Sequence, residues 1–188
     1  ARILIERADR EGARALAAKA MSVKPAPVSA YLVNAAIAEA DEEAERALQW
    51  FEKALAAYPG NRQAKLGRIA ALGALGRIDA VRPLVAELRK SDPNDREVLV
   101  LAARLAAEDG DWREVRDLLQ PLERDLEANP DANSLYAESL LALGQAEQAR
   151  IRLTAQMRRE PENLRVRQLL ARARKATGEG APVPRLPS

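Results

Sequence analysis

The sequence predicts an all-α fold built from repeated antiparallel helix pairs, and two kinds of observation lead there. Hydrophobic residues make up 47% of the 188 residues but aromatic residues only 3%, so the apolar side chains are mainly Ala and Leu, which favour helices. Glycine, Asn or Asp, and proline also recur in three separate series that share one constant spacing. The series are Gly76, Gly110, Gly144 and Gly178; Asn61, Asp95, Asn129 and Asn163; and Pro25, Pro59 and Pro93, with Pro161 two periods further on. The shared spacing is 34 residues, and a period of this length is typical of stacked structural repeats.

Each series has a separate role at the ends of helices. Glycine after the first helix of a pair supplies a left-handed residue without a steric penalty. Proline after the second helix ends it, because the ring removes a hydrogen-bond donor. Asn or Asp two residues later accepts a hydrogen bond from the next helix as an N-cap. Asp111 and Glu114 form a further capping box after Gly110.

Four residues depart from the series. Pro130 follows the N-cap Asn129, so it falls at the first helical position, where a missing donor costs nothing. Glu42 stands where the other repeats have glycine, and we expect a looser turn there. Pro83 falls within the first turns of a second helix, whereas Pro121 lies further in and predicts a kink or a break.

The period and the small residues at the helix crossings resemble the tetratricopeptide repeat, a helix–turn–helix unit of about 34 residues. The match is best over residues 28–61, which carry Ala35, Ala47, Phe51, Ala54 and Pro59. The resemblance implies a right-handed superhelix, an α-solenoid of stacked antiparallel helix pairs. It also implies a single array over residues 1–178. We expect a partial repeat at 1–27, complete repeats at 28–61, 62–95, 96–129 and 130–163, a capping helix within 164–178, and an extended proline-rich tail at 179–188.

In this family, particular positions of each first helix line a concave groove, and the resemblance carries those positions over to this chain. The predicted partner-binding residues are Leu32, Ala36, Leu66, Ala70, Val100, Arg104, Glu138 and Arg172. The groove would grade from apolar through acidic to basic and would suit a helix or extended peptide of complementary character. The alternative is that the charged positions are ordinary solvated side chains, and Leu32 and Leu66 are the stronger candidates for contact.

The composition argues against several other functions. The chain has no cysteine and no histidine, which removes thiolate and imidazole chemistry and their metal sites. No phosphate-binding glycine loop and no nucleophile beside a base is present, so we expect no enzyme activity and no cofactor. The net charge is +2 and no aromatic residue lies among the arginines of residues 146–188, so we expect no nucleic-acid partner. No apolar stretch is long enough for a transmembrane helix.

The sequence therefore predicts a non-catalytic scaffold that binds a protein or peptide partner. The Ala-, Leu- and Arg-rich composition resembles repeat arrays of bacterial envelope assemblies, such as polysaccharide secretion, pilus or outer-membrane biogenesis. One alternative is a spacer that forms a homo-oligomer through its end repeats. Another is the C-terminal repeat region of a larger envelope protein, such as a zinc peptidase or chaperone. The compartment stays open between periplasm and cytoplasm.

Overall fold

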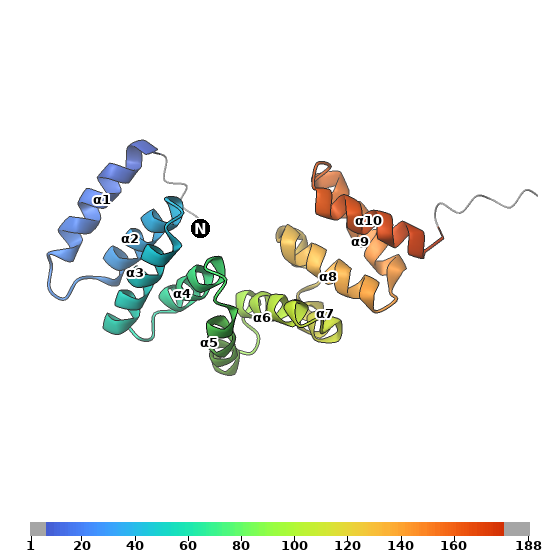
Figure 1. Cartoon of the computed structure of the whole chain (residues 1–188), viewed down its shortest axis with the longest axis horizontal. Coiled ribbons are helices and arrows are strands. Elements are labelled where there is room, and N and C mark those ends of the chain that lie inside the picture. Colours follow the sequence, from blue (N-terminus) through green and yellow to red (C-terminus); the bar gives the residue numbers. More distant parts are fainter. Residues whose placement is uncertain (1–6, 179–188) are drawn as a thin grey trace, which may run out of the picture. The chain divides into compact units, whose positions relative to one another are not determined.

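All regular secondary structure in the described part of the chain is helical. The structure is a computed structural model that describes residues 7–178, and within that range it has ten α-helices, two short 3₁₀ helices and no strand (Figure 1). The helices are α1 (Arg7–Met21), α2 (Val28–Ala40), α3 (Ala44–Ala57), α4 (Arg62–Ala74), α5 (Ile78–Ser91), α6 (Arg96–Glu108), α7 (Trp112–Leu119), η1 (Gln120–Leu122), η2 (Leu126–Ala128), α8 (Pro130–Ala142), α9 (Ala146–Arg159) and α10 (Leu164–Ala176). The all-α helix-pair prediction is confirmed, and the predicted tail at 179–188 lies outside the described residues.

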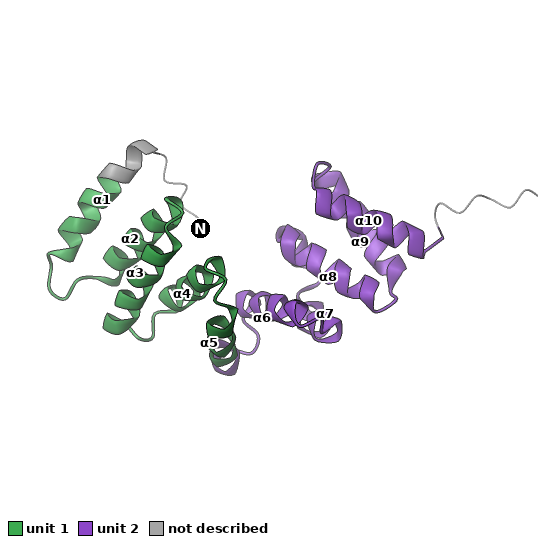
Figure 2. Cartoon of the chain, in the orientation of Figure 1, with its two compact units in different colours: residues 1–87 green, residues 88–188 purple. Residues whose placement is uncertain are grey.

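The chain divides into two compact units, residues 1–87 and residues 88–188 (Figure 2). In unit 1, consecutive helices pack on one another from α1 through α4. In unit 2, packing again follows chain order from α6 through α10, and α10 also contacts α8. Contact between neighbours in the sequence is the packing expected of stacked helical repeats. The repeat boundaries drawn from the sequence stay a prediction.

The predicted N-caps are confirmed at four helices. The side-chain oxygen of Asn61 accepts a hydrogen bond from the Ala64 amide at 2.8 Å, and Asp95 caps α6 through the amides of Glu97 and Val98. Asn129 and Asn163 cap α8 and α10 in the same way. These bonds satisfy amides that the first turn of a helix leaves open, each contributing roughly 1 kcal/mol. The sequence series therefore marks real helix starts.

The left-handed glycines are also confirmed, and the turn at Glu42 corrects one expectation. Gly76, Gly110, Gly144 and Gly178 have φ between 70° and 77°, and Glu42 has φ 59°. The turn at Glu42 is not looser than the others: the amide of Glu43 donates to the Ala38 carbonyl at 2.8 Å, the bond that the glycine turns also make. A side chain in this conformation costs about 1–2 kcal/mol, so the tight turn forms despite the residue.

The core of each unit repeats with the same period as the glycine series. In the first helices, Ala35, Ala103 and Ala137 are fully buried at the crossing with the second helix. Facing positions on the second helices hold small or branched residues that are equally buried, namely Ala47, Val81, Val115 and Ala149. Ala171 occupies the same place in α10 but is exposed, because no second helix follows it among the described residues. The buried alanines at these positions are the small residues predicted at the crossings.

The predicted break at Pro121 is confirmed. Helix α7 ends at Leu119 after eight residues, whereas α3, α5 and α9 each have 14. The chain continues through η1 and η2, where Leu122 and Leu126 are buried. Pro83 does not break α5, which runs through it. Pro121 falls ten residues into the second helix of its repeat and Pro83 six residues into its own, so a longer stretch of helix precedes Pro121.

Candidate functional site

The predicted groove residues of unit 1 lie on its two complete first helices. Leu32 and Ala36 lie on α2, and Leu66 and Ala70 lie on α4, one repeat later. Leu32, Ala36 and Leu66 are half-buried and Ala70 is exposed. Both leucines therefore retain apolar surface that the helices of their own unit do not cover.

The predicted groove residues of unit 2 are tied together by ion pairs between successive first helices. Arg104 on α6 lies 3.9 Å from Asp131 on α8, measured from Nη2 to Oδ2. Glu138 on α8 pairs with Arg165 at 3.0 Å and with Arg172 at 3.5 Å, both on α10. The structure thus brings Glu138 and Arg172 together, and their role in binding a partner stays a prediction. Val100 on α6 is half-buried.

These ion pairs order the surface more than they stabilise the fold. The arginines of the three pairs are at least half exposed, and such pairs are typically worth less than about 1 kcal/mol. Glu138 is the exception in exposure, because its side chain is 22% exposed and lies between two arginines. A partner that replaces one arginine at Glu138 would meet a carboxylate already held in place.

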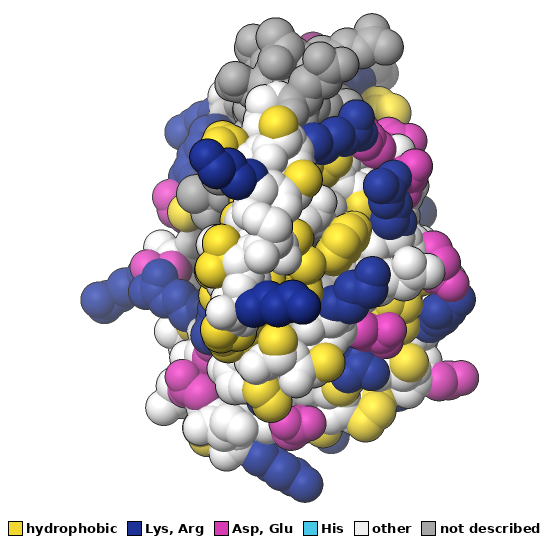
Figure 3. All heavy atoms as spheres, turned by 90° about the vertical axis from the view of Figure 1, so that its left-hand side faces the viewer, with side chains coloured by type: hydrophobic (Ala, Val, Ile, Leu, Met, Phe, Trp, Pro, Cys, Tyr) yellow, Lys and Arg dark blue, Asp and Glu magenta, His cyan; other side chains and the backbone are white. Residues whose placement is uncertain are grey.

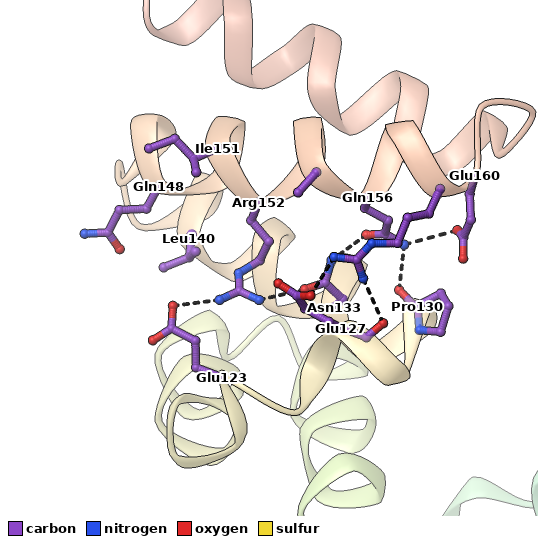
Figure 4. A pocket seen from close by; sticks show the side chains of 12 residues that line it. Glu123, Glu127, Pro130, Asn133, Leu140, Gln148, Ile151, Arg152, Gln156 and Glu160 are labelled. Atoms are coloured by element: carbon purple, nitrogen blue, oxygen red, sulfur yellow. Dashed lines mark hydrogen bonds and ion pairs between the residues drawn. The ribbon is translucent and has the colours of Figure 1, made fainter.

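A second candidate site is a pocket of about 310 Å³ within unit 2 (Figure 4). Its walls are α8, α9 and the chain that follows the break at Pro121. The lining residues are Glu123, Glu127, Pro130, Asn133, Leu140, Gln148, Ile151, Arg152, Ala155, Gln156, Arg159 and Glu160. None of the eight predicted groove residues is among them. The volume is in the range of pockets that hold small ligands or side chains.

A chain of hydrogen bonds runs across this pocket. Arg152 donates to Asn133 Oδ1 at 2.7 Å and to Glu123 Oε1 at 2.6 Å, as Figure 4 shows. Asn133 in turn donates to Gln156 Oε1 at 2.7 Å, and Gln156 donates to the Pro130 carbonyl at 3.0 Å. Asn133 and Gln156 are buried, so these bonds satisfy amide groups that would otherwise be costly to bury.

The ring of Tyr136 contacts Arg152 and so supports the same network. The guanidinium carbon of Arg152 lies 4.9 Å from the centre of the ring, which is a cation–π contact. Burial raises the pKa of the Tyr136 phenol, and the nearby Glu123 carboxylate raises it further, while Arg152 and Arg116 lower it. Arg152 is therefore held by a ring, a carboxylate and an amide at once.

Sequence reasoning missed the pocket, although one signal was available. Gln156 occupies a place that holds Ala54, Leu88 and Leu122 in the three preceding repeats. A polar residue at a position that is otherwise apolar indicates a local departure from the repeat packing. Its partner Asn133 is buried one helix away, and only the fold brings the two together.

Neither a metal site among the described residues nor a continuous patch of one charge on the face drawn in Figure 3 is found. Among residues 7–178, no group of three or more side chains could hold a metal ion. In Figure 3, hydrophobic side chains and charges of both signs are interspersed, and neither sign forms a continuous patch on that face. None of the described helices has the length and apolar character needed to cross a membrane.

A family model described as the tetratricopeptide repeat matches residues 38–105 and 106–173, which together exceed half of the chain. Among curated proteins, no match to the sequence is found.

Several solved structures share the fold. A tetratricopeptide repeat protein from Parabacteroides merdae aligns with a TM-score of 0.66 at 17% identity, covering 92% of this chain and 69% of the other. A thermophilic tetratricopeptide repeat protein of Thermus thermophilus aligns with a TM-score of 0.62 at 18% identity, covering 88% and 91%. YrrB, a tetratricopeptide repeat protein with an unusual peptide-binding site, aligns with a TM-score of 0.59 at 13% identity, covering 96% and 95%. At these identities, the likeness concerns the fold.

Proposed function

The chain belongs to the tetratricopeptide repeat family, and from this premise we propose that it is a non-catalytic scaffold that binds a segment of a partner protein along its first helices. Proteins of this family generally serve as scaffolds for protein interaction. YrrB has a peptide-binding site, so a fold of this kind can hold a peptide. The narrower setting of a bacterial envelope assembly is supported by the Ala-, Leu- and Arg-rich composition.

The observation that carries the proposal is the uncovered apolar surface at one repeat position in unit 1. Leu32 on α2 and Leu66 on α4 lie one full repeat apart, and neither is fully covered by its neighbours. Fully burying an exposed leucine side chain contributes roughly 1.5–3 kcal/mol. Leu32 and Leu66 are half-buried, so each would contribute part of that amount when a partner covers it. In unit 2, the paired charges at Glu138 add a site where charge sets the register of the partner.

The test is Leu66→Glu against peptides selected from a random phage-displayed library on the full chain. A selected peptide, labelled with a fluorophore, is titrated with each protein and its anisotropy is recorded. We expect Leu66→Glu to weaken binding about tenfold or more, because it places a charge in the apolar anchor. The circular dichroism spectrum should stay that of the wild type, because Leu66 is only half-buried.

Leu16→Glu is the matched control for this experiment. Leu16 is also a leucine of unit 1, is 71% exposed and lies on α1, which is not one of the first helices. The control should bind the selected peptides as the wild type does. Equal affinity of Leu66→Glu and wild type would remove the first-helix surface of unit 1 from consideration.

Self-association through the end helices is the competing proposal, and exposed leucines favour it. Leu16 on α1 and Leu164 on α10 are 71% and 67% exposed. Light scattering over a concentration series separates the two functions. A monomer that binds the selected peptides supports the scaffold. A stable oligomer that Leu16→Glu or Leu164→Glu dissociates would support self-association instead.

A further inference from the structure

The pocket of unit 2 is a departure from the repeat pattern with its own lining. It lies where α7 stops at Leu119 and the 3₁₀ segment replaces the rest of a second helix. Glu123 and Glu127 come from this irregular segment, while α8 and α9 supply the opposite walls. We propose that this pocket binds a basic side chain, arginine or lysine, of a partner's peptide segment. The proposal concerns a different surface from Leu32 and Leu66.

The charged groups of the pocket favour a cationic ligand over an anionic one. The pocket has three carboxylates against two guanidinium groups. Arg152 is bonded to Glu123 and Asn133, and Arg159 is bonded to the side chain and the carbonyl of Glu127. These bonds engage both arginines with acceptors of the protein itself. Each guanidinium has three further N–H groups, but an anionic ligand that reached them would face three carboxylates against two guanidinium groups.

The three carboxylates can accept further hydrogen bonds from a cationic group. Arg152 bonds to Oε1 of Glu123, and Arg159 bonds to Oε2 of Glu127. The Glu160 Oε2 atom accepts from Gln156 at 3.3 Å and from Asn163 at 2.8 Å. Each carboxylate thus has its second oxygen outside these bonds, and such an oxygen readily accepts a charge-assisted hydrogen bond. A guanidinium or ammonium group supplies the matching donors.

The apolar part of the lining fits the rest of such a side chain. Leu140, Ile151 and Ala155 line the pocket beside the polar groups. Ile151 is 60% exposed, which leaves a large apolar side chain at the pocket open to solvent (Figure 4). The aliphatic stem of arginine or lysine packs on apolar surface while its charged end reaches polar groups. An apolar residue next to it in the partner would cover Ile151.

The buried amides hold the pocket in shape before any ligand arrives. Asn133 and Gln156 are 4% and 5% exposed and bridge α8 to α9 through their 2.7 Å hydrogen bond. Gln156 also bonds to the carbonyl of Pro130, at the start of α8. Because these groups are already fixed, binding requires little ordering of the protein.

The test uses the full chain, labelled with ¹⁵N, and N-acetyl-arginyl-leucine amide as the probe. The same dipeptide with citrulline in place of arginine has nearly the same shape and no charge. We expect the arginine probe to shift the side-chain amide signals of Asn133 and Gln156, and the citrulline probe to leave them unchanged. Equal shifts with both probes, or no shift at these residues, would overturn the proposal.

Two variants locate the binding. Glu123→Gln keeps an acceptor for Arg152 but removes the charge, and it should weaken the arginine probe about threefold. Glu147→Gln removes one charge from the exposed side of α9, outside the pocket, and should leave the affinity unchanged. Equal weakening by both variants would mean general attraction to the surface, against a built pocket.

A third variant does not depend on the ion pairs. Ala155→Phe fills the pocket without changing a charge, because Ala155 lines it and is not fully buried. It should abolish the shifts caused by the arginine probe, and unchanged shifts would contradict the proposal. Leu66→Glu should leave probe binding unchanged, so failure of the peptide scaffold in unit 1 and failure of this pocket can be told apart.

Discussion

At residue 67, glycine lets an aromatic ring lie directly against a helix. A Cβ atom added to Gly67 on α4 would stand 2.2 Å from the ring atoms Cε1 and Cζ of Phe51 on α3. The ring is 5% exposed and has little room to move. The glycine is therefore required by packing between α3 and α4, whereas Gly73 on the same helix meets nothing within 4 Å.

Gly67→Ala should lower the free energy of unfolding by about 1–3 kcal/mol, because the new methyl group overpacks the contact with Phe51. Urea denaturation followed by circular dichroism measures the change. Gly73→Ala is the matched control and should be neutral or stabilising by up to roughly 1 kcal/mol, since alanine is the better helix former. Equal effects of the two substitutions would show that the ring does not rest on residue 67.

The raised pKa of Tyr136 predicts how the free energy of unfolding changes at high pH. Its pKa is raised in the folded protein, first by burial and then by Glu123, so folding favours the protonated phenol. This contribution is fully present below the unfolded pKa of about 10 and is lost as the pH rises through the higher folded pKa. From about pH 9 upward, the free energy of unfolding should therefore fall less steeply in Tyr136→Phe than in the wild type. Parallel slopes in urea titrations would contradict the assignment.

Among the second helices of the complete repeats, α7 is the short one, and its length follows from one proline. Proline at residue 121 removes the donor that would continue the helix past Leu119. The chain then forms η1 and η2, and buries Leu122 and Leu126 from this irregular segment. The same segment carries Glu123 and Glu127 to the pocket, so the break creates the site.

Pro121→Ala should extend α7 by about one turn, because the restored amide can donate to the carbonyl four residues earlier. Backbone chemical shifts of residues 120–124 would move toward helical values. Pro83→Ala is the control: α5 already runs through Pro83, and its ends should stay in place. Unchanged shifts at 120–124 would mean that burial of Leu122 and Leu126, rather than the proline, holds the irregular segment.

At the scale of the whole molecule, packing between sequence neighbours makes stability local. Unit 1 and unit 2 each have their own buried residues, including Ala47 and Phe51 in the first and Val115 and Leu153 in the second. In repeat proteins, stability is close to a sum over repeats and their nearest-neighbour interfaces. A local defect should then loosen its own unit first.

Hydrogen exchange of Gly67→Ala tests this expectation. Amides of α2, α3 and α4 should exchange faster than in the wild type, because the altered contact lies between α3 and α4. Amides of α8, α9 and α10 should keep their wild-type protection. An equal loss of protection along the whole described chain would show that the two units unfold together.

Many of the helix ends could be predicted from local features of the sequence. Gly76 and Asn61 act through the backbone within a few residues, so their spacing reveals turns and caps without knowledge of the fold. The positions of small residues such as Ala47 can be predicted in the same way, because they follow from the resemblance to the family. The break at Pro121 belongs here too, because a missing donor is a property of the residue itself.

The pocket depends instead on how the helices pack, which the sequence does not show. Asn133 and Gln156 are 23 residues apart and meet only because α8 and α9 pack side by side, and Glu123 reaches Arg152 only because the chain leaves the helix after Leu119. Such contacts depend on distances between elements, which no local pattern encodes. The same holds for the Phe51 ring at Gly67, because their contact exists only once α3 lies on α4.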